Sequence, residues 1–303
     1  MSEVSQEIKN YLTSLYGEIS EKQYSEFIKK DPSVYLRINT LKTNKTELTR
    51  SLNDQYGIIC SEIENLPNAL KVIEGEKVIG KTLQHITGKF YMQGLSSMIP
   101  PLVLSPNSED KVLDLCAAPG SKTTALGELM QNKGTLIANE ISQNRVGMLV
   151  FNIDRINLCN TAVTHNRGEW LNRCFSEYFD KILVDAPCSG LGILHKRDEV
   201  SDWWSLERAE DLGELQYRLL ASAVKMLRVG GELVYSTCTL TIEENELIID
   251  KILNKYPVEI KEINLPIISI NGFTEYNGLK LNPSLNLSKR IIPWEVDSDG
   301  FFI

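Results

Sequence analysis

Short apolar runs alternate with longer segments of helical periodicity over the C-terminal two thirds of the chain. Five of these runs have the length of buried strands and end in small or turn-forming residues. They are KVLDL (111–115), TLIANE (135–140), TAVTH (161–165), DKILVDAP (180–187) and GELVYST (231–237). Helical spacing of apolar residues follows Ser121, Ser142 and Ser205 and returns over 242–253. Because strands alternate with helices, the pattern predicts an α/β fold with a doubly wound, mostly parallel sheet.

The first 90 residues have a different pattern of apolar and polar positions. Their predicted elements are two short polar helices (4–30), a strand (32–42), a helix (46–55) and three short strands (57–63, 69–73 and 76–80). This mixture is typical of a small α+β module, so we predict two domains, 1–95 and 96–303. The tail loses the alternation, and its last residues, DGFFI (299–303), are predicted to add a final strand at a sheet edge.

Composition and charge exclude several classes of protein. The 303 residues are 42% apolar and 24% charged, as in a soluble globular protein. No apolar run approaches the length of about 18 residues that a membrane-spanning helix needs. The N-terminus is polar and lacks a leader pattern, so we expect a cytoplasmic protein with no membrane partner. Six cysteines without zinc-binding spacing indicate reduced thiols and no metal. The formal net charge of −8 confines any binding of nucleic acid to a local patch.

The segment VLDLCAAPGSKTT (112–124) is the first that carries chemistry. A strand ends near Asp114, small residues allow the backbone to turn close to a ligand, and a helix begins near Ser121. Neither a phosphate loop nor GxGxxG is present. The second strand ends at Glu140, where a carboxylate can bind ribose hydroxyls. S-adenosylmethionine has a ribose and no phosphate, so it fits both features. The alternative is a plain strand–turn–helix with a surface glutamate.

Two further segments follow the fourth and fifth predicted strands. They are DAPCSG (185–190) and STCTL (236–240). Because neighbouring parallel strands end at one edge of a sheet, Cys188 and Cys238 are expected to face one crevice with Asp185. A single cysteine at such a place is by default a buried structural residue. Two of them beside a carboxylate point instead to chemistry.

The motifs DLCAAPGSKT, DAPCSG and STCTLTIEENE, in this order and spacing, resemble the RNA cytosine-C5 methyltransferases of the NOL1/NOP2/Sun family. CAAPGSKTT together with TLIANEISQNRV is most similar to the bacterial 16S rRNA type F branch. The resemblance covers roughly residues 32–303, since it extends to LRINTLK, YMQGLSSMIP and the terminal DGFFI. It implies a Rossmann-like S-adenosylmethionine-dependent methyltransferase domain (96–303) and a small α+β domain (1–95) that presents RNA. The implied partner is rRNA or tRNA, and we expect a monomer.

The resemblance also implies roles for individual residues. Cys238 would be the nucleophile that adds to C6 of cytosine and so lets C5 take a methyl group. Cys188 would assist release. Asp185, if protonated or sharing a proton with the base, would hydrogen-bond N3 of cytosine. Lys122 would lie close enough to lower a thiol pKa. The implied cofactor contacts are Cys116, Ala117, Ala118, Pro119, Gly120, Ser121, Lys122, Glu140, Arg145 and Asp185. For Arg145, a solvated helix face is the alternative.

Three departures from the family pattern bear on the substrate and the cofactor. Arg167 stands where many relatives carry an aspartate that contacts adenine, and Asn166 is the available substitute. HKRDEV (195–200) lacks the usual proline, although its basic residues could contact phosphates. The chain ends at Ile303, where type F relatives continue into a further RNA-binding domain, so type F resemblance does not fix the RNA. The pair Trp203–Trp204 near the crevice offers aromatic faces on which bases stack.

Three other functions are alternatives to an active RNA methyltransferase. A non-catalytic RNA-binding or ribosome-assembly protein would keep the fold without the reaction. A DNA cytosine methyltransferase would use Cys188 as its nucleophile, and its methyl-transfer activity would persist after substitution of Cys238. An NAD-dependent dehydrogenase is disfavoured because the loop at 116–121 lacks the glycines that a pyrophosphate needs.

Overall fold

The computed structural model describes residues 4–197 and 199–303 and divides into two compact units. Unit 1 comprises Met1–Pro32, Ala186–Ala221 and Ser236–Ile303. Unit 2 comprises Ser33–Asp185 and Ser222–Tyr235. The domain boundary between residues 95 and 96 stays a prediction.

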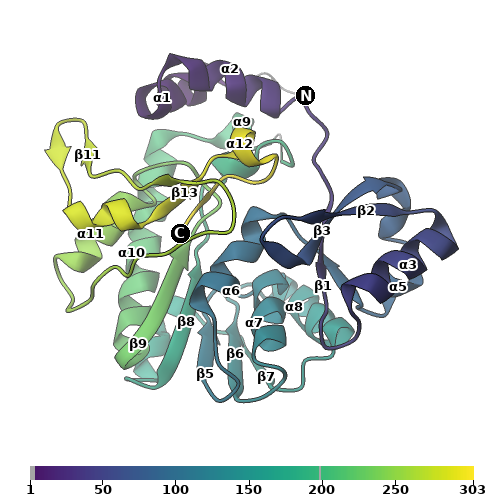
Figure 1. The fold of residues 1–303 in the computed structure, drawn as a ribbon. Helices are drawn as coiled ribbons and strands as arrows, with labels where there is room; N and C mark the ends of the chain where they lie inside the picture. The colour runs from purple at the N-terminus through teal and green to yellow at the C-terminus, as the bar shows by residue number, and fades with distance from the viewer. Residues whose placement is uncertain (1–3, 198) are drawn as a thin grey trace. The chain divides into compact units, whose positions relative to one another are not determined.

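A five-stranded sheet forms the larger part of unit 2, in the order β7-β6-β5-β8-β9 (Figure 1). Its strands are β5 (Lys111–Asp114), β6 (Thr135–Asn139), β7 (Thr161–Thr164), β8 (Phe179–Asp185) and β9 (Leu227–Ser236). β5 pairs in parallel with both β6 and β8. Helix α6 (Ile99–Leu104) precedes β5, and α7 (Ser121–Leu129), α8 (Gln143–Ile156) and α10 (Leu206–Met226) lie between strands in the chain. All five predicted strands and the Rossmann-like α/β class are therefore confirmed.

Unit 2 also holds a four-stranded antiparallel sheet in the order β2-β3-β1-β4. Its elements are β1 (Tyr35–Ile38), α3 (Lys45–Tyr56), β2 (Ile59–Ile63), β3 (Leu66–Glu74) and β4 (Phe90–Met92). Leu36, Leu48 and Leu70 form its fully buried core. The prediction of a strand at 76–80 is wrong, because this segment forms the helical turn α4 (Glu76–Ile79), followed by α5 (Leu83–Ile86). Gly75, with φ 95°, turns the chain, and its carbonyl accepts the amide of Ile79 at 3.1 Å.

One buried ion pair joins the antiparallel sheet of unit 2 to helix α7. Arg37 on β1 donates to Glu128 Oε1 at 2.9 Å, and the two side chains are 8% and 7% exposed. Arg37 also donates to Thr124 Oγ1 at 2.7 Å and to the Ser121 carbonyl at 2.6 Å. Because all three acceptors lie on α7, this arginine fixes β1 against the helix that follows the Cys116–Gly120 loop.

Unit 1 is built around helices from distant parts of the chain. Its elements are α1 (Gln6–Tyr16), α2 (Glu18–Phe27), α9 (Val200–Trp203), most of α10, α11 (Glu246–Leu253) and α12 (Pro293–Val296). Small strands complete it: β10 (Ile270–Asn271), β11 (Glu275–Tyr276), β12 (Leu279–Lys280), β13 (Lys289–Ile291) and β14 (Phe301–Phe302). One apolar cluster joins Ile8 and Leu12 of α1 to Leu191 and Leu240.

The predicted C-terminal strand is present as β14, but it pairs with β13 in a separate three-stranded sheet. An isolated bridge also links Phe302 to Thr237, the residue before Cys238. The segment after β9 is thus fixed by the end of the chain. Among the described residues, no helix has both the length and the apolar character needed to cross a membrane.

Candidate active site

The loop Leu115–Gly120 connects β5 to α7 in unit 2. Gly120 precedes α7 with φ 106°, a left-handed conformation that favours glycine. Glu140, at the end of β6, is 2% exposed and accepts the Ala118 amide at 3.2 Å and the Ser142 amide at 2.8 Å. Arg145 donates to the Ala118 carbonyl and lies 3.6 Å from Glu140. Glu140 and Arg145 therefore contact the loop itself, although the Arg145 side chain is 46% exposed.

Carboxylates converge on this loop from three neighbouring strand ends. Cys116 is a half-buried residue, and the pKa of its thiol is raised well above the usual range by burial and then by Asp114, Asp185 and Glu140. Cys116 is therefore a neutral thiol in a negative environment. Burial also raises the pKa of Asp114 to about 7. A cationic sulfonium with a ribose fits a loop with backbone amides and surrounding carboxylates better than an anionic pyrophosphate does.

Lys122 and Asp185 form an ion pair in unit 2. Lys122 Nζ lies 2.6 Å from Asp185 Oδ2 and 3.0 Å from Ser97 Oγ. The Lys122 side chain is 8% exposed and that of Asp185 is 27% exposed. α7 supplies the lysine from its first turn, and β8 ends at the aspartate. The more accessible partner is thus the carboxylate, and the ammonium group anchors it.

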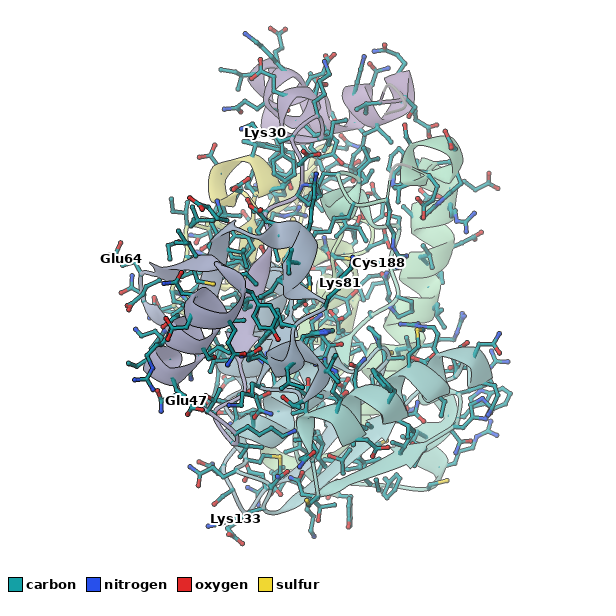
Figure 2. All side chains as sticks on the ribbon, turned by 90° about the vertical axis from the view of Figure 1, so that its right-hand side faces the viewer. Lys30, Glu47, Glu64, Lys81, Lys133 and Cys188 are labelled. Carbon is teal, nitrogen blue, oxygen red and sulfur yellow. The ribbon has the colours of Figure 1, made fainter. Side chains whose placement is uncertain are left out.

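Cys188 and Cys238 lie together in unit 1. Their Sγ atoms are 3.3 Å apart, and both residues are half-buried thiols. Cys188 comes three residues after the end of β8, and Cys238 two residues after the end of β9 (Cys188 is labelled in Figure 2). The amide of Gly192 donates to the Cys238 carbonyl at 3.0 Å, so the two cysteine segments are also joined through their backbones.

A buried carboxylate that the sequence analysis left without a role holds both cysteine segments. Glu244 is fully buried and accepts from the Ser189 amide at 2.8 Å and from the Ser189 hydroxyl. It also accepts from Gln216 Nε2 at 2.9 Å and from Thr241 Oγ1 at 2.7 Å. Burial raises the pKa of this carboxyl. The signal in the sequence is the acidic pair Glu243–Glu244 of TIEEN, which lies a few residues after STC and next to the apolar residues of 247–249.

Several of the basic and aromatic candidates make contacts within the protein. His195 has a side chain only 4% exposed, packs its ring against Phe27 at a tilt and has its pKa lowered to about 4 by burial. Lys196 pairs with Asp299 at 2.6 Å. Trp204 is 4% exposed and donates to Ser189 Oγ at 3.2 Å. Trp203 is only partly buried, so it remains the aromatic candidate of the pair.

Arg167 stands where many relatives carry an aspartate that contacts adenine. Its side chain contacts residues that follow it closely in the chain. Its Nε donates to Glu169 Oε1 at 2.8 Å, and its guanidinium lies 4.4 Å from the centre of the Trp170 ring. The Asn166 carbonyl accepts from Asn139 Nδ2 at 3.1 Å. Within the described ranges, no group of three or more His, Cys, Asp or Glu residues could hold a metal ion.

Comparisons with known proteins place these features in context. A family model described as 16S rRNA methyltransferase RsmB/F matches residues 101–303. The chain is 32% identical to a tRNA (cytosine(49)-C(5))-methyltransferase of Pyrococcus abyssi, over 98% of this chain and 95% of that one. It is 36% identical to ribosomal RNA small subunit methyltransferase F of Shigella dysenteriae, over 88% of this chain but 55% of that one.

A similar solved structure is a methyltransferase homolog protein from Pyrococcus horikoshii. It has a TM-score of 0.86 and 31% identity, and the match covers 97% of this chain and 92% of that one.

Proposed function

Because the chain belongs to the NOL1/NOP2/Sun family of S-adenosylmethionine-dependent RNA cytosine-C5 methyltransferases, we propose that it methylates a cytosine of rRNA or tRNA through a covalent cysteine adduct. The observation that supports this mechanism is the Cys188–Cys238 pair, with Sγ atoms 3.3 Å apart. One thiol is enough for nucleophilic addition to a base. A second thiol within proton-transfer distance serves a step that a single nucleophile cannot perform by itself.

Cys238 loses its thiol proton and adds to C6 of the cytosine; as N3 takes up a proton, the electrons of the C5=C6 bond shift so that C5 becomes nucleophilic. When bound, the cofactor supplies a methyl group on a sulfonium centre. C5 then loses its proton to a base, the electrons return to the ring, and the C6–Sγ bond breaks. Cys188 assists this release, because its Sγ is within reach of the Cys238 sulfur. A target cytosine inside a helix would first have to be flipped out.

Asp185 binds the edge of the cytosine, and Lys122 holds Asp185 in place through the 2.6 Å ion pair. The lysine ammonium can also share a proton with the carboxylate when N3 of the adduct needs one. The cofactor would be held by the loop Cys116–Gly120, by Ser121 and Lys122 at the start of α7, and by Glu140, Arg145 and Asp185. Glu140 already accepts two amides, and a carboxylate has further lone pairs for a ribose hydroxyl.

The test uses tritiated S-adenosylmethionine with unmodified tRNA and small-subunit rRNA, offered separately. Wild type is expected to label one of them. Cys238→Ala should abolish the label, and Cys188→Ala should accumulate a covalent protein–RNA adduct that survives denaturing electrophoresis. Cys174→Ala is the matched control, because Cys174 is exposed and lies in unit 2.

Label transfer that survives Cys238→Ala and stops in Cys188→Ala would refute the assignment of the nucleophile. Cofactor binding without transfer to either RNA would refute catalysis on these RNAs and favour the non-catalytic RNA-binding function.

A further inference from the structure

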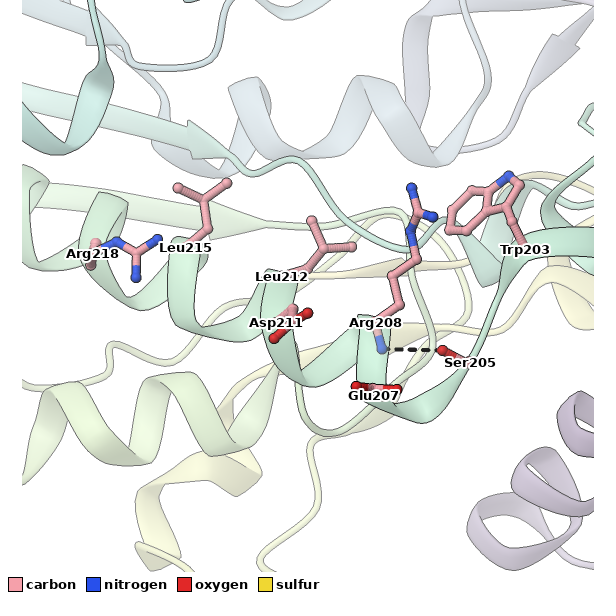
Figure 3. A pocket seen from close by; sticks show the side chains of 8 residues that line it. All are labelled: Trp203, Ser205, Glu207, Arg208, Asp211, Leu212, Leu215 and Arg218. Atoms are coloured by element: carbon pink, nitrogen blue, oxygen red, sulfur yellow. Dashed lines mark hydrogen bonds between the residues drawn. The ribbon is translucent and has the colours of Figure 1, made fainter.

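An open groove runs along one side of α10 in unit 1 (Figure 3). Its lining residues are Trp203, Ser205, Glu207, Arg208, Asp211, Leu212, Leu215 and Arg218. Arg208, Leu212 and Leu215 follow each other at helical spacing, and Figure 3 shows them on the same side of the helix as the Trp203 ring. The groove thus has an aromatic end, an aliphatic middle and a second arginine beyond it.

The aromatic end is already arranged for stacking. The Arg208 guanidinium lies 4.3 Å from the centre of the Trp203 ring. Trp203 packs from one side against the apolar cluster of unit 1, and it is only partly buried. Arg208 and Arg218 are both exposed. Ten residues separate them, which corresponds to about 15 Å along a helix.

The groove lies on elements that hold the loop of Cys188. Gln216, next to Leu215 on α10, is fully buried and donates to the Pro187 carbonyl at 2.8 Å. Trp204, next to Trp203, donates to the Ser189 hydroxyl at 3.2 Å. The residues before and after Cys188 are therefore fixed by side chains adjacent in sequence to groove residues. An RNA strand bound in the groove would therefore lie on unit 1, which also contains Cys188 and Cys238.

The charge of the groove selects among possible nucleic-acid partners. Two arginines are balanced by Glu207 and Asp211, so a general attraction for polyanions is not expected here. The Glu207 and Asp211 carboxylates on α10 repel the second phosphate backbone of a duplex. A single unpaired base instead gains from the Trp203 face, while its phosphates contact the two arginines.

We propose that this groove, called here the Trp203 groove, is an additional RNA subsite that binds an unpaired nucleotide flanking the target cytosine. The proposal rests on the proposed function, because it takes the occupant to be the RNA substrate. The base stacks on the Trp203 ring in the place that the Arg208 guanidinium occupies in this structure, Arg208 moves to a phosphate, and Arg218 contacts a phosphate further along the strand.

The first test measures binding without needing the natural substrate. Fluorescein-labelled pentacytidylate and a short RNA duplex are titrated with wild type, Trp203→Ala, Trp203→Phe, Arg208→Gln and Trp170→Ala. Trp203→Ala should weaken binding of the single strand by about tenfold, the size of one lost base–aromatic stack. Trp203→Phe should recover most of this loss, and Arg208→Gln should reduce the salt dependence by about one phosphate contact.

Trp170→Ala is the matched control, because Trp170 is 48% exposed and also carries a stacked arginine, yet it lies in unit 2. Its binding should equal that of wild type. In the methyl-transfer assay, Trp203→Ala should raise KM for the RNA that wild type labels and leave kcat unchanged. Since Arg208 is exposed, Arg208→Gln keeps the test valid even if Trp203→Ala fails to fold.

Equal binding of pentacytidylate by wild type, Trp203→Ala and Arg208→Gln would overturn the proposal. So would a change confined to self-association in sedimentation, which would make the groove an interface between copies of the chain. A wild type that binds the single strand through Trp203 but labels neither RNA would retain the subsite and refute the proposed catalysis.

Discussion

Replacement of Glu244 tests whether one buried carboxylate holds the two cysteine segments together. In Glu244→Ala, the Ser189 and Thr241 hydroxyls can turn toward other acceptors, since Ser189 Oγ already lies 2.9 Å from Thr239 Oγ1. The Ser189 amide and the Gln216 amide would lose the Glu244 acceptor inside the protein. Each unsatisfied buried donor costs about 1–3 kcal/mol, so we expect a loss of about 2–6 kcal/mol in the free energy of unfolding.

The loss of Glu244 should be visible in function as well as in stability. Urea unfolding measures the loss of stability, and the rate at which a thiol reagent modifies Cys238 reports on the change at the site. We expect faster modification and a lower kcat, because the segments on both sides of the Sγ pair are released. Glu244→Gln should be milder, since its amide oxygen can still accept from the Ser189 and Gln216 amides.

Glu214→Ala is the control for Glu244→Ala. Glu214 is on α10 and pairs with Lys251, but the two side chains are 58% and 51% exposed. Exposed pairs contribute about 0–1 kcal/mol, so this variant should unfold nearly like wild type. If Glu244→Ala were no less stable than Glu214→Ala and its cysteines reacted at the wild-type rate, the inferred role of Glu244 would be wrong.

Three further predictions follow from buried or paired groups. Arg37→Met should lower the free energy of unfolding by about 3–5 kcal/mol, because it leaves the buried Glu128 carboxylate without its ion-pair partner. Adding Glu128→Leu removes that charge and should recover part of the loss, measured by urea unfolding. Burial lowers the pKa of His195 to about 4 from 6.5. The unfolded chain therefore binds the proton more readily, and the contribution of His195 to stability is complete above pH 6.5 and is lost as the pH falls toward 4. The loss is about 1.4 kcal/mol per pH unit in that window, and a His195→Gln protein should lack it in unfolding curves recorded at pH 7 and pH 5. Mild peroxide should convert the Cys188 and Cys238 thiols to a disulfide, with two electrons and two protons reducing the peroxide to water; intact mass and activity should both return with dithiothreitol, and unchanged thiol content would refute it.

The parallel sheet could be predicted from the sequence because each strand is a short apolar run between segments of helical spacing. The segment 76–80 could not, since four or five residues with Val and Ile fit a strand and a helical turn equally well. Gly75 and the hydrogen bond to its carbonyl decide in favour of the turn. His195 shows the same limit for a site, because its basic neighbours predict exposure and only its packing on Phe27 shows burial.

The sequence by itself determined which chemistry is available: two cysteines after successive strands, an acidic residue at the ends of β5, β6 and β8, and a loop that suits a cofactor without phosphates. It also determined the order of the parallel strands along the chain. Only the tertiary structure decided that Glu244 binds Ser189 and Gln216, 55 and 28 residues away, and that Arg37 binds α7. Hydrogen bonds between residues so far apart leave no periodic pattern in a sequence, because the fold alone brings their donors and acceptors within reach.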